Sequence, residues 1–227
     1  MSQSKYSLFV VDDHPMTRFG IRELIGTTDN LSVIGESDNA EDTLEKVQKL
    51  RPDLLLVDLT LRGRSGLELI KDLRKVQPDV EILVFSMHEE TFYAERVLRS
   101  GARGYVMKSE SSDRLLEAIH SVLQGKVFVS DLVANHFLNK MTGRPTEDSN
   151  SPVARLTDRE LEVLALVGRA RESREIAKSL GMSVKTVEAH RASIRNKLDI
   201  KSRAELVRFA VLWVAETGAD ELTSAEG

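Results

Sequence analysis

The chain has 227 residues, of which 41% are hydrophobic and 30% charged, and it contains no cysteine. This composition is that of an ordinary globular protein, and the lack of cysteine excludes a disulfide scaffold, a cysteine-ligated metal and an iron–sulfur centre. The apolar stretch near the N-terminus is too short for a signal peptide, and the longest apolar run, residues 209–215, is far below the roughly 20 residues of a membrane span. We therefore expect a cytoplasmic protein without a membrane segment.

Charge is unevenly distributed along the chain. Residues 1–150 hold 19 basic and 24 acidic residues, residues 151–212 hold 13 basic and 8 acidic residues, and four acids follow. A basic block inside an acidic chain suggests a segment that meets a polyanion. The alternative is an ordinary solvated surface, which often carries such a surplus.

The first 125 residues alternate between two patterns. Runs rich in Val, Ile and Leu are typical of buried parallel strands and lie at residues 8–11, 31–34, 54–57, 82–85 and 104–106. Helical periodicity follows each run, at residues 16–25, 40–50, 66–76, 91–99 and 112–123. The pairs Asp38/Glu41 and Ser65/Glu68 have the spacing of capping boxes. Five such units predict an α/β fold with a doubly wound five-stranded parallel sheet.

The rest of the chain has no strand pattern. We expect a helix at residues 131–141, then a flexible linker to residue 154, and a small all-α domain from Leu156 to about Ala215. The predicted domains are residues 1–125, a linker helix and flexible linker at 126–154, a helical domain at 155–215 and an acidic tail at 216–227.

Polar side chains stand at the ends of four predicted strands. Asp12 and Asp13 follow the first strand and Asp58 ends the third, while Ser86 ends the fourth and Lys108 follows the fifth. Open α/β sheets bind ligands at this edge. Three neighbouring carboxylates repel one another unless a cation lies among them, and oxygen ligands favour Mg²⁺. A strand-terminal Asp taken alone often only caps a loop, so the prediction depends on all five residues.

A carboxylate beside Mg²⁺ and a lysine can attack a phosphoryl group and form an acyl phosphate. Asp58 is the predicted nucleophile because it stands alone at the end of a strongly apolar strand, and Asp12 and Asp13 are the predicted metal ligands. Lys108 suits a phosphate as a point charge. His14 is expected to be a loop residue and not a ligand.

The order and spacing of Asp12-Asp13, Asp58, Ser86, Tyr105 and Lys108 resemble the receiver domain of two-component response regulators, over residues 5 to about 125. The resemblance implies a flavodoxin-like receiver. It also implies phosphotransfer from a sensor histidine kinase to Asp58.

The same resemblance implies further roles. Ser86 would bind the new phosphoryl group and Tyr105 would change rotamer as a switch. Ser109 and Arg62 stand where many receivers have proline, which leaves the rigidity of those loops in question. His88, like Thr60, is at a position that tunes dephosphorylation in the family. The implied ligands of Mg²⁺ are Asp12, Asp13, Asp58 and the backbone carbonyl of Thr60.

Residues 174–190 have the pattern of two helices joined by a tight turn at Gly181, with Ser183 capping the second helix. Such a helix-turn-helix places the outward face of its second helix in the major groove of DNA. The predicted contact residues are Lys185, Thr186, Glu188, Ala189, Arg191, Ala192, Arg195 and Lys197.

These residue types suit different parts of DNA. The basic side chains suit phosphates, and Ala189 and Ala192 could approach thymine methyl groups. Glu188 has two equal interpretations, because it could accept from cytosine or pair within its helix with Lys185 or Arg191.

Residues 156–212 resemble the LuxR-type helix-turn-helix, and the whole chain resembles the NarL/FixJ subfamily of response regulators. The residues that carry this resemblance are Leu156-Thr157-x-Arg159-Glu160, Glu175-Ile176-Ala177, Thr186-Val187-x-x-His190 and Lys197-Leu198. By analogy His190 packs and does not read bases. Ala170 stands where the family usually has glycine, which predicts a turn shifted toward Gly168.

Ser202 and Glu205 have capping-box spacing and begin a last helix that is apolar on more than one face. In this family the last helix is a dimer contact. We therefore expect Val207, Val211 and Trp213 to support a homodimer on double-stranded DNA. The alternative is that Trp213 packs within the chain.

The predicted function is a response regulator in which phosphorylation of Asp58 modulates sequence-specific DNA binding, and not a turnover enzyme. A haloacid-dehalogenase-type phosphatase would need a second Asp where Thr60 stands, and an esterase elbow would need glycine at Leu67. A third alternative is a DNA-binding regulator whose receiver serves only for dimerisation.

Overall fold

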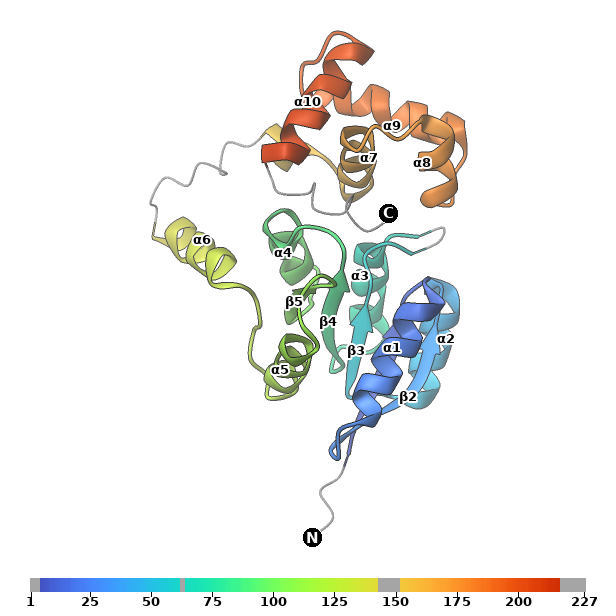
Figure 1. Cartoon of the computed structure of the whole chain (residues 1–227), viewed down its shortest axis with the longest axis vertical. Coiled ribbons are helices and arrows are strands. Elements are labelled where there is room, and N and C mark those ends of the chain that lie inside the picture. The colour runs from blue at the N-terminus through green and yellow to red at the C-terminus, as the bar shows by residue number, and fades with distance from the viewer. Residues whose placement is uncertain (1–4, 62–63, 143–151, 217–227) are drawn as a thin grey trace. The chain divides into compact units, whose positions relative to one another are not determined.

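The computed structural model describes residues 5–61, 64–142 and 152–216. The chain forms two compact units, an N-terminal unit up to Ala134 and a C-terminal unit from Asn135 (Figure 1). Most of the predicted flexible linker and nearly all of the acidic tail lie outside the described residues. Among the helices that are described, none is both long and apolar enough to cross a membrane.

The N-terminal unit alternates strands and helices, as the sequence predicts. Its strands are β1 (Tyr6–Val11), β2 (Leu31–Ser37), β3 (Leu54–Val57), β4 (Glu81–Ser86) and β5 (Gly104–Met107). Its helices are α1 (Pro15–Gly26), α2 (Ala40–Leu50), α3 (Gly66–Val76), α4 (Glu90–Arg99) and α5 (Ser112–Leu123). The strands form one parallel sheet in the order β2-β1-β3-β4-β5, so the prediction of a doubly wound five-stranded sheet is confirmed.

Alternation along the strands divides the core between the two faces of the sheet. Leu8 and Val10 of β1 lie in one cluster with Ile21 of α1 and Ile119 of α5, so these two helices cover one face. Phe9 lies between them in the strand and is fully buried outside this cluster, so it points to the other face, where a Cβ built on Gly35 would lie 2.6 Å from its ring. Both faces are covered, which explains why the strands are nearly continuous apolar runs.

The turn after β3 is shaped by a close approach of backbone. A Cβ on Gly66 would lie 2.2 Å from the carbonyl oxygen of Asp58, so only glycine fits there. The Gly66 N–H donates to the carbonyl of Leu59, and Ser65 is buried and caps α3 through the Leu67 N–H. The turn thereby holds the end of β3 in one position.

One predicted cap is wrong. Asn39, and not Asp38, is the N-cap of α2, because its side chain accepts from the Asp42 N–H at 2.9 Å. Asp38 instead accepts a hydrogen bond from the Asn39 side chain. The spacing rule placed the cap one residue early. Ser65 is confirmed as the cap of α3.

The segment after α5 remains part of the N-terminal unit. Phe128 pairs with Gly104 along the free edge of β5, and the Tyr105 N–H donates to its carbonyl at 2.9 Å. A further helix, α6 (Asp131–Met141), follows with the predicted bounds. Phe128, within the predicted linker, therefore adds one isolated bridge to the edge of the sheet.

The C-terminal unit contains helices and no strand among its described residues. After the short 3₁₀ turn Pro152–Arg155 it contains α7 (Asp158–Gly168), α8 (Ser173–Ser179), α9 (Val184–Lys197) and α10 (Arg203–Glu216). A Cβ on Gly168 would lie 2.5 Å from the carbonyl oxygen of Ala210, so α7 and α10 pack backbone to backbone there. The prediction of a small all-α unit after an α/β one is confirmed.

The turn between α7 and α8 differs from the prediction. Gly168 is the last residue of α7 and is needed for close packing, while Ala170 takes the left-handed backbone conformation with φ of 56°. The turn has therefore not shifted toward Gly168. Alanine occupies the position at which a glycine would avoid the steric cost of this conformation.

Candidate functional site

Two carboxylates from different strand ends share one buried ammonium. Asp12 and Asp58 are 1% and 3% exposed. Lys108 Nζ lies 2.7 Å from Asp12 Oδ2 and 2.7 Å from Asp58 Oδ2. The structure therefore brings together three of the side chains that the sequence placed at strand ends.

Asp13 and His14 complete the cluster. The His14 backbone N–H donates to Asp12 Oδ1, and its ring Nδ1 lies 2.7 Å from Asp13 Oδ1. Oxygen or nitrogen atoms of Asp12, Asp13, His14 and Asp58 all lie within 4.8 Å of one another. His14 is the N-cap residue of α1, because Pro15 disfavours a helical backbone before it. The His14 ring therefore belongs to the cluster of carboxylates, whereas the sequence predicted only a loop residue.

The charges of the cluster do not balance. Burial alone would lower the pKa of Lys108, but Asp58 and Asp12 outweigh it and raise this pKa above its ordinary value. One ammonium still faces three carboxylates, so a divalent cation would be stabilised there. The donors are mainly hard oxygens, and such a cluster is typical of a Mg²⁺ site.

The end of β4 connects this cluster to α4. Ser86 is fully buried, and the His88 N–H approaches its hydroxyl oxygen at 3.4 Å. His88 Nε2 lies 3.0 Å from the Thr60 hydroxyl, and the buried Tyr105 hydroxyl donates to the His88 carbonyl at 2.7 Å. Burial raises the pKa of Tyr105 well above its ordinary value, so the phenol remains a neutral donor. Ser86 and Tyr105 are thus joined through His88, a contact that the sequence did not predict.

Of the two positions at which many receivers have proline, the structure describes Ser109 but not Arg62. Ser109 lies in the turn after β5, where the Glu110 N–H donates to the carbonyl of Met107.

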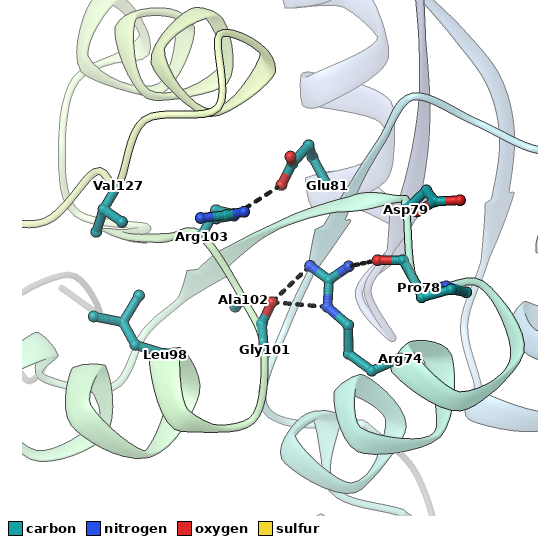
Figure 2. A pocket seen from close by; sticks show the side chains of 9 residues that line it. All are labelled: Arg74, Pro78, Asp79, Glu81, Leu98, Gly101, Ala102, Arg103 and Val127. Carbon is teal, nitrogen blue, oxygen red and sulfur yellow. Dashed lines mark hydrogen bonds and ion pairs between the residues drawn. The ribbon is translucent and has the colours of Figure 1, made fainter.

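A hollow of about 580 Å³ is lined by Arg74 of the last turn of α3 and by residues near the start of β4 and the end of α4 (Figure 2). The Arg74 guanidinium donates to the carbonyls of Gly101, Pro78 and Val80 at 2.6–2.8 Å. Arg103 pairs with Glu81 beside it, as Figure 2 shows. Arg74 thus connects the ends of α3 and α4 to the start of β4. Because its guanidinium donors are occupied by backbone carbonyls, we assign the hollow a structural role and not a binding role.

In the C-terminal unit, α8 and α9 form the predicted helix-turn-helix. Gly181 takes a left-handed conformation in the turn, and Ser183 caps α9 through the Thr186 N–H at 3.0 Å. Val187 and Ile194 are buried on one side of α9, whereas Lys185 and Ala189 are exposed on the other. The exposed side is the candidate nucleic-acid face.

Not every predicted contact residue points freely outward. Arg191 donates to the Ser173 hydroxyl at 2.7 Å, and Lys197 pairs with Glu160 at 2.7 Å. Glu188 lies 3.9 Å from Arg191 of its own helix, the intrahelical pair of one interpretation. It is also bonded to Ser173 of α8 and Arg203 of α10, contacts that the sequence did not predict. Thr186 shares a hydrogen bond with Ser183, while Ala192 and Arg195 are half-buried.

The exposed apolar residues of α10 are only partly those expected. Val207 and Val211 are 36% and 42% exposed, and Leu212 is 50% exposed. Trp213 is 8% exposed, so the position of its ring does not support a role in a dimer surface and favours packing within the chain. His190 is half-buried, in keeping with the packing role expected of it.

Glu160 connects the start of α7 to α9, a role that the sequence did not predict. It forms a capping box with Thr157 and accepts from Ser193 at 2.6 Å and Lys197 at 2.7 Å. The Thr-x-x-Glu spacing before an apolar run was a sufficient signal for the cap. The contacts with α9 carry no such signal, because they join residues more than thirty positions apart.

These two units match two protein families. Residues 8–120 match the response regulator receiver domain, and residues 154–210 match the bacterial regulatory proteins of the luxR family. The chain belongs to the NarL-type response regulators, with a receiver followed by a LuxR-type helix-turn-helix.

Individual relatives agree with this assignment over nearly the whole chain. The oxygen regulatory protein NreC of Staphylococcus carnosus is 34% identical over 90% of this chain and 96% of its own length. RcsB of Salmonella enterica serovar Typhimurium, solved on promoter rprA with the phosphomimetic BeF₃⁻, is 26% identical with a TM-score of 0.62 over 92% of this chain and 99% of that one. A structure of two RcsB dimers on two parallel DNAs is 27% identical with a TM-score of 0.56, over 92% and 98% of the two chains. The protein is accordingly a DNA-binding response regulator and not a turnover enzyme.

Proposed function

We propose that Asp58 is phosphorylated by a sensor histidine kinase in the cytoplasm and that the phosphoryl group controls DNA binding by α9. The observation that carries this proposal is the position of Lys108 Nζ, 2.7 Å from both Asp12 and Asp58. A lysine held there can pair with a carboxylate oxygen before phosphorylation and with a phosphoryl oxygen after it. An ion pair that served only the protein surface would remain exposed to solvent and would contribute little.

In the proposed reaction a carboxylate oxygen of Asp58 attacks the phosphorus of the donor. One P–O bond forms as the bond from phosphorus to the donor breaks, and the donor keeps the electron pair. Mg²⁺, held by Asp12, Asp13, Asp58 and the Thr60 carbonyl, would neutralise charge on the phosphoryl oxygens. Lys108 then pairs with one of these oxygens, and the Ser86 hydroxyl donates to another.

The proposed path out of the site runs along residues 86–90. Tyr105 donates to the carbonyl of His88, and two residues further the carboxylate of Glu90 accepts from the Ser130 N–H at 2.8 Å. Ser130 immediately precedes α6, and its hydroxyl accepts from the Val133 N–H. A shift of Ser86 toward a phosphoryl group would therefore reach the start of α6 through these hydrogen bonds.

On DNA, Thr186, Ala189 and Ala192 are the proposed base-side contacts. The proposed cations for phosphates are Lys185, Arg191, Arg195 and Lys197. We also propose a homodimer through the exposed Val207 and Val211 of α10. The RcsB dimers on DNA support this proposal for a protein of similar sequence.

The direct test of the chemistry is intact-protein mass spectrometry after incubation with acetyl phosphate and Mg²⁺. The wild-type protein should gain the mass of one phosphoryl group, and EDTA should abolish the gain. Asp58→Ala should gain nothing, and Lys108→Ala should gain less than wild type while remaining folded. Equal labelling of Asp58→Ala would place the phosphoryl group elsewhere.

A further inference from the structure

A network of polar side chains in the C-terminal unit holds one carboxylate of α9. Glu188 Oε1 accepts from the Ser173 hydroxyl at 2.6 Å, and Oε2 lies 3.0 Å from Arg203 Nη2. Arg191 Nη1 donates to the same Ser173 hydroxyl and lies 3.9 Å from Glu188 Oε1. The network thus joins the first residue of α8, the middle of α9 and the first residue of α10.

The surroundings keep this carboxylate ionised and engaged. The hydrogen bond from Ser173 lowers the pKa of Glu188 against the effect of burial, and Arg203, Arg191 and Arg195 lower it further. To accept from a base, Glu188 would have to move away from Ser173 and Arg203, one on each oxygen. A free carboxylate beside the phosphates of a duplex is also repelled by them, whereas one paired with a guanidinium is not.

Arg203 has the properties of a cation presented to solvent. Its side chain is 77% exposed, and Glu188 is its one ion pair within the described part of the chain. It borders a hollow of about 440 Å³, together with Ser173 and Arg191. The sequence did not place Arg203 among the DNA contacts, because it lies outside the recognition helix in the chain.

We propose that Glu188 is a positioning residue and not a base reader: it holds Arg203 beside α9, where the guanidinium contacts a phosphate of the bound DNA. The inference rests on DNA binding by α9 and goes beyond it in assigning a contact on α10. It also predicts that the two side chains act as one unit. Removing either side chain should therefore weaken DNA binding by about the same factor, and removing both should weaken it no further.

The test is selection of duplexes from a random-sequence pool by the full-length protein with acetyl phosphate and Mg²⁺, followed by affinity measurements on the recovered DNA. Glu188→Ala and Arg203→Ala should each weaken binding about tenfold without changing the preferred base at any position, since only a phosphate contact is lost. The double variant should bind no more weakly than the weaker single variant. The exchanged pair Glu188→Arg with Arg203→Glu should recover part of the loss.

Salt dependence and a matched variant separate positioning from a general loss of charge. Arg203→Ala and Glu188→Ala should lower the slope of log affinity against log salt by about 1. Arg208→Ala removes another exposed arginine of α10, one without a partner among the described residues, and should leave the slope unchanged. Arg203 is mostly exposed, so its removal should leave the urea midpoint of the unit unchanged.

Two results would overturn the inference. One is the loss of a single base preference in Glu188→Ala with Arg203→Ala unaffected, which would make Glu188 a base reader. The other is an unchanged salt slope in Arg203→Ala. Failure of the wild-type protein to enrich any sequence would instead contradict the proposed function.

Discussion

Glu160 should make the C-terminal unit unstable to acid. Burial opposes ionisation of this carboxyl, but hydrogen bonds from Lys197, Ser193 and Thr157 outweigh it and lower its pKa from 4.5 to about 2. A lowered folded-state pKa gives stability that is present above the unfolded value of 4.5 and is lost as the pH falls toward 2. At about 1.4 kcal/mol per pH unit, the shift corresponds to about 3 kcal/mol.

The assay is urea unfolding followed by the fluorescence of Trp213. The chain has one tryptophan, so this signal reports the C-terminal unit alone. Wild type should lose about 3 kcal/mol of unfolding free energy between about pH 5 and pH 2 more than Glu160→Gln does, because the amide does not ionise. Glu160→Gln should be the less stable protein at pH 7. Parallel pH dependence in the two proteins would refute the role assigned to the Glu160 contacts.

Three further changes test other parts of the structure. Ala170→Gly should raise the unfolding free energy of the C-terminal unit by about 1 kcal/mol, since glycine takes the left-handed backbone without a steric cost; a loss of stability by the same fluorescence assay would contradict this. Arg74→Met should destabilise the N-terminal unit by about 2 kcal/mol, because the carbonyl groups of Gly101, Pro78 and Val80 lose a charged donor; an unchanged urea midpoint by circular dichroism would show that water replaces it. Glu90→Ala should speed amide hydrogen exchange at Ser130 in the full-length protein, whereas Glu90→Gln keeps an acceptor there; equal exchange in the two variants would show that the Glu90–Ser130 contact does not order the start of α6.

The pH dependence of Glu90 has the opposite sign to that of Glu160. Burial raises the pKa of Glu90 above its ordinary value, and the hydrogen bonds from Ser130 only partly oppose this. Its ionisation therefore costs stability as the pH rises from the unfolded value through the raised one. The decrease in unfolding free energy with rising pH that Glu90 causes should appear in the N-terminal unit. It should be absent in Glu90→Gln.

Local patterns were enough to predict the elements of this fold. The bounds of α2, α3 and α5 agree with the predicted ones, because apolar spacing and capping residues act within a few positions. The apolar runs also placed the strand ends closely enough to group Asp12, Asp58 and Lys108 at one edge of the sheet.

Contacts between distant segments were not predictable in the same way. The sequence could not show that Glu90 accepts from Ser130, or that Glu188 pairs with Arg203, since both depend on how helices pack. The cap of α2 was misplaced because Asp38 and Asn39 are both good caps and only the backbone decides between them. Ala170 was misread because glycine was assumed to be required where the chain tolerates strain.

The central claim is that a phosphoryl group on Asp58 changes the affinity for DNA. It is tested most directly by titrating the full-length protein against a duplex recovered by selection, with and without acetyl phosphate and Mg²⁺, for wild type and Asp58→Ala. Wild type should bind at least tenfold more tightly with the donor present, a change of about 1.4 kcal/mol, and Asp58→Ala should not respond. Equal affinities of the two proteins under both conditions would contradict phosphoryl control and leave the receiver only a structural or dimerising role.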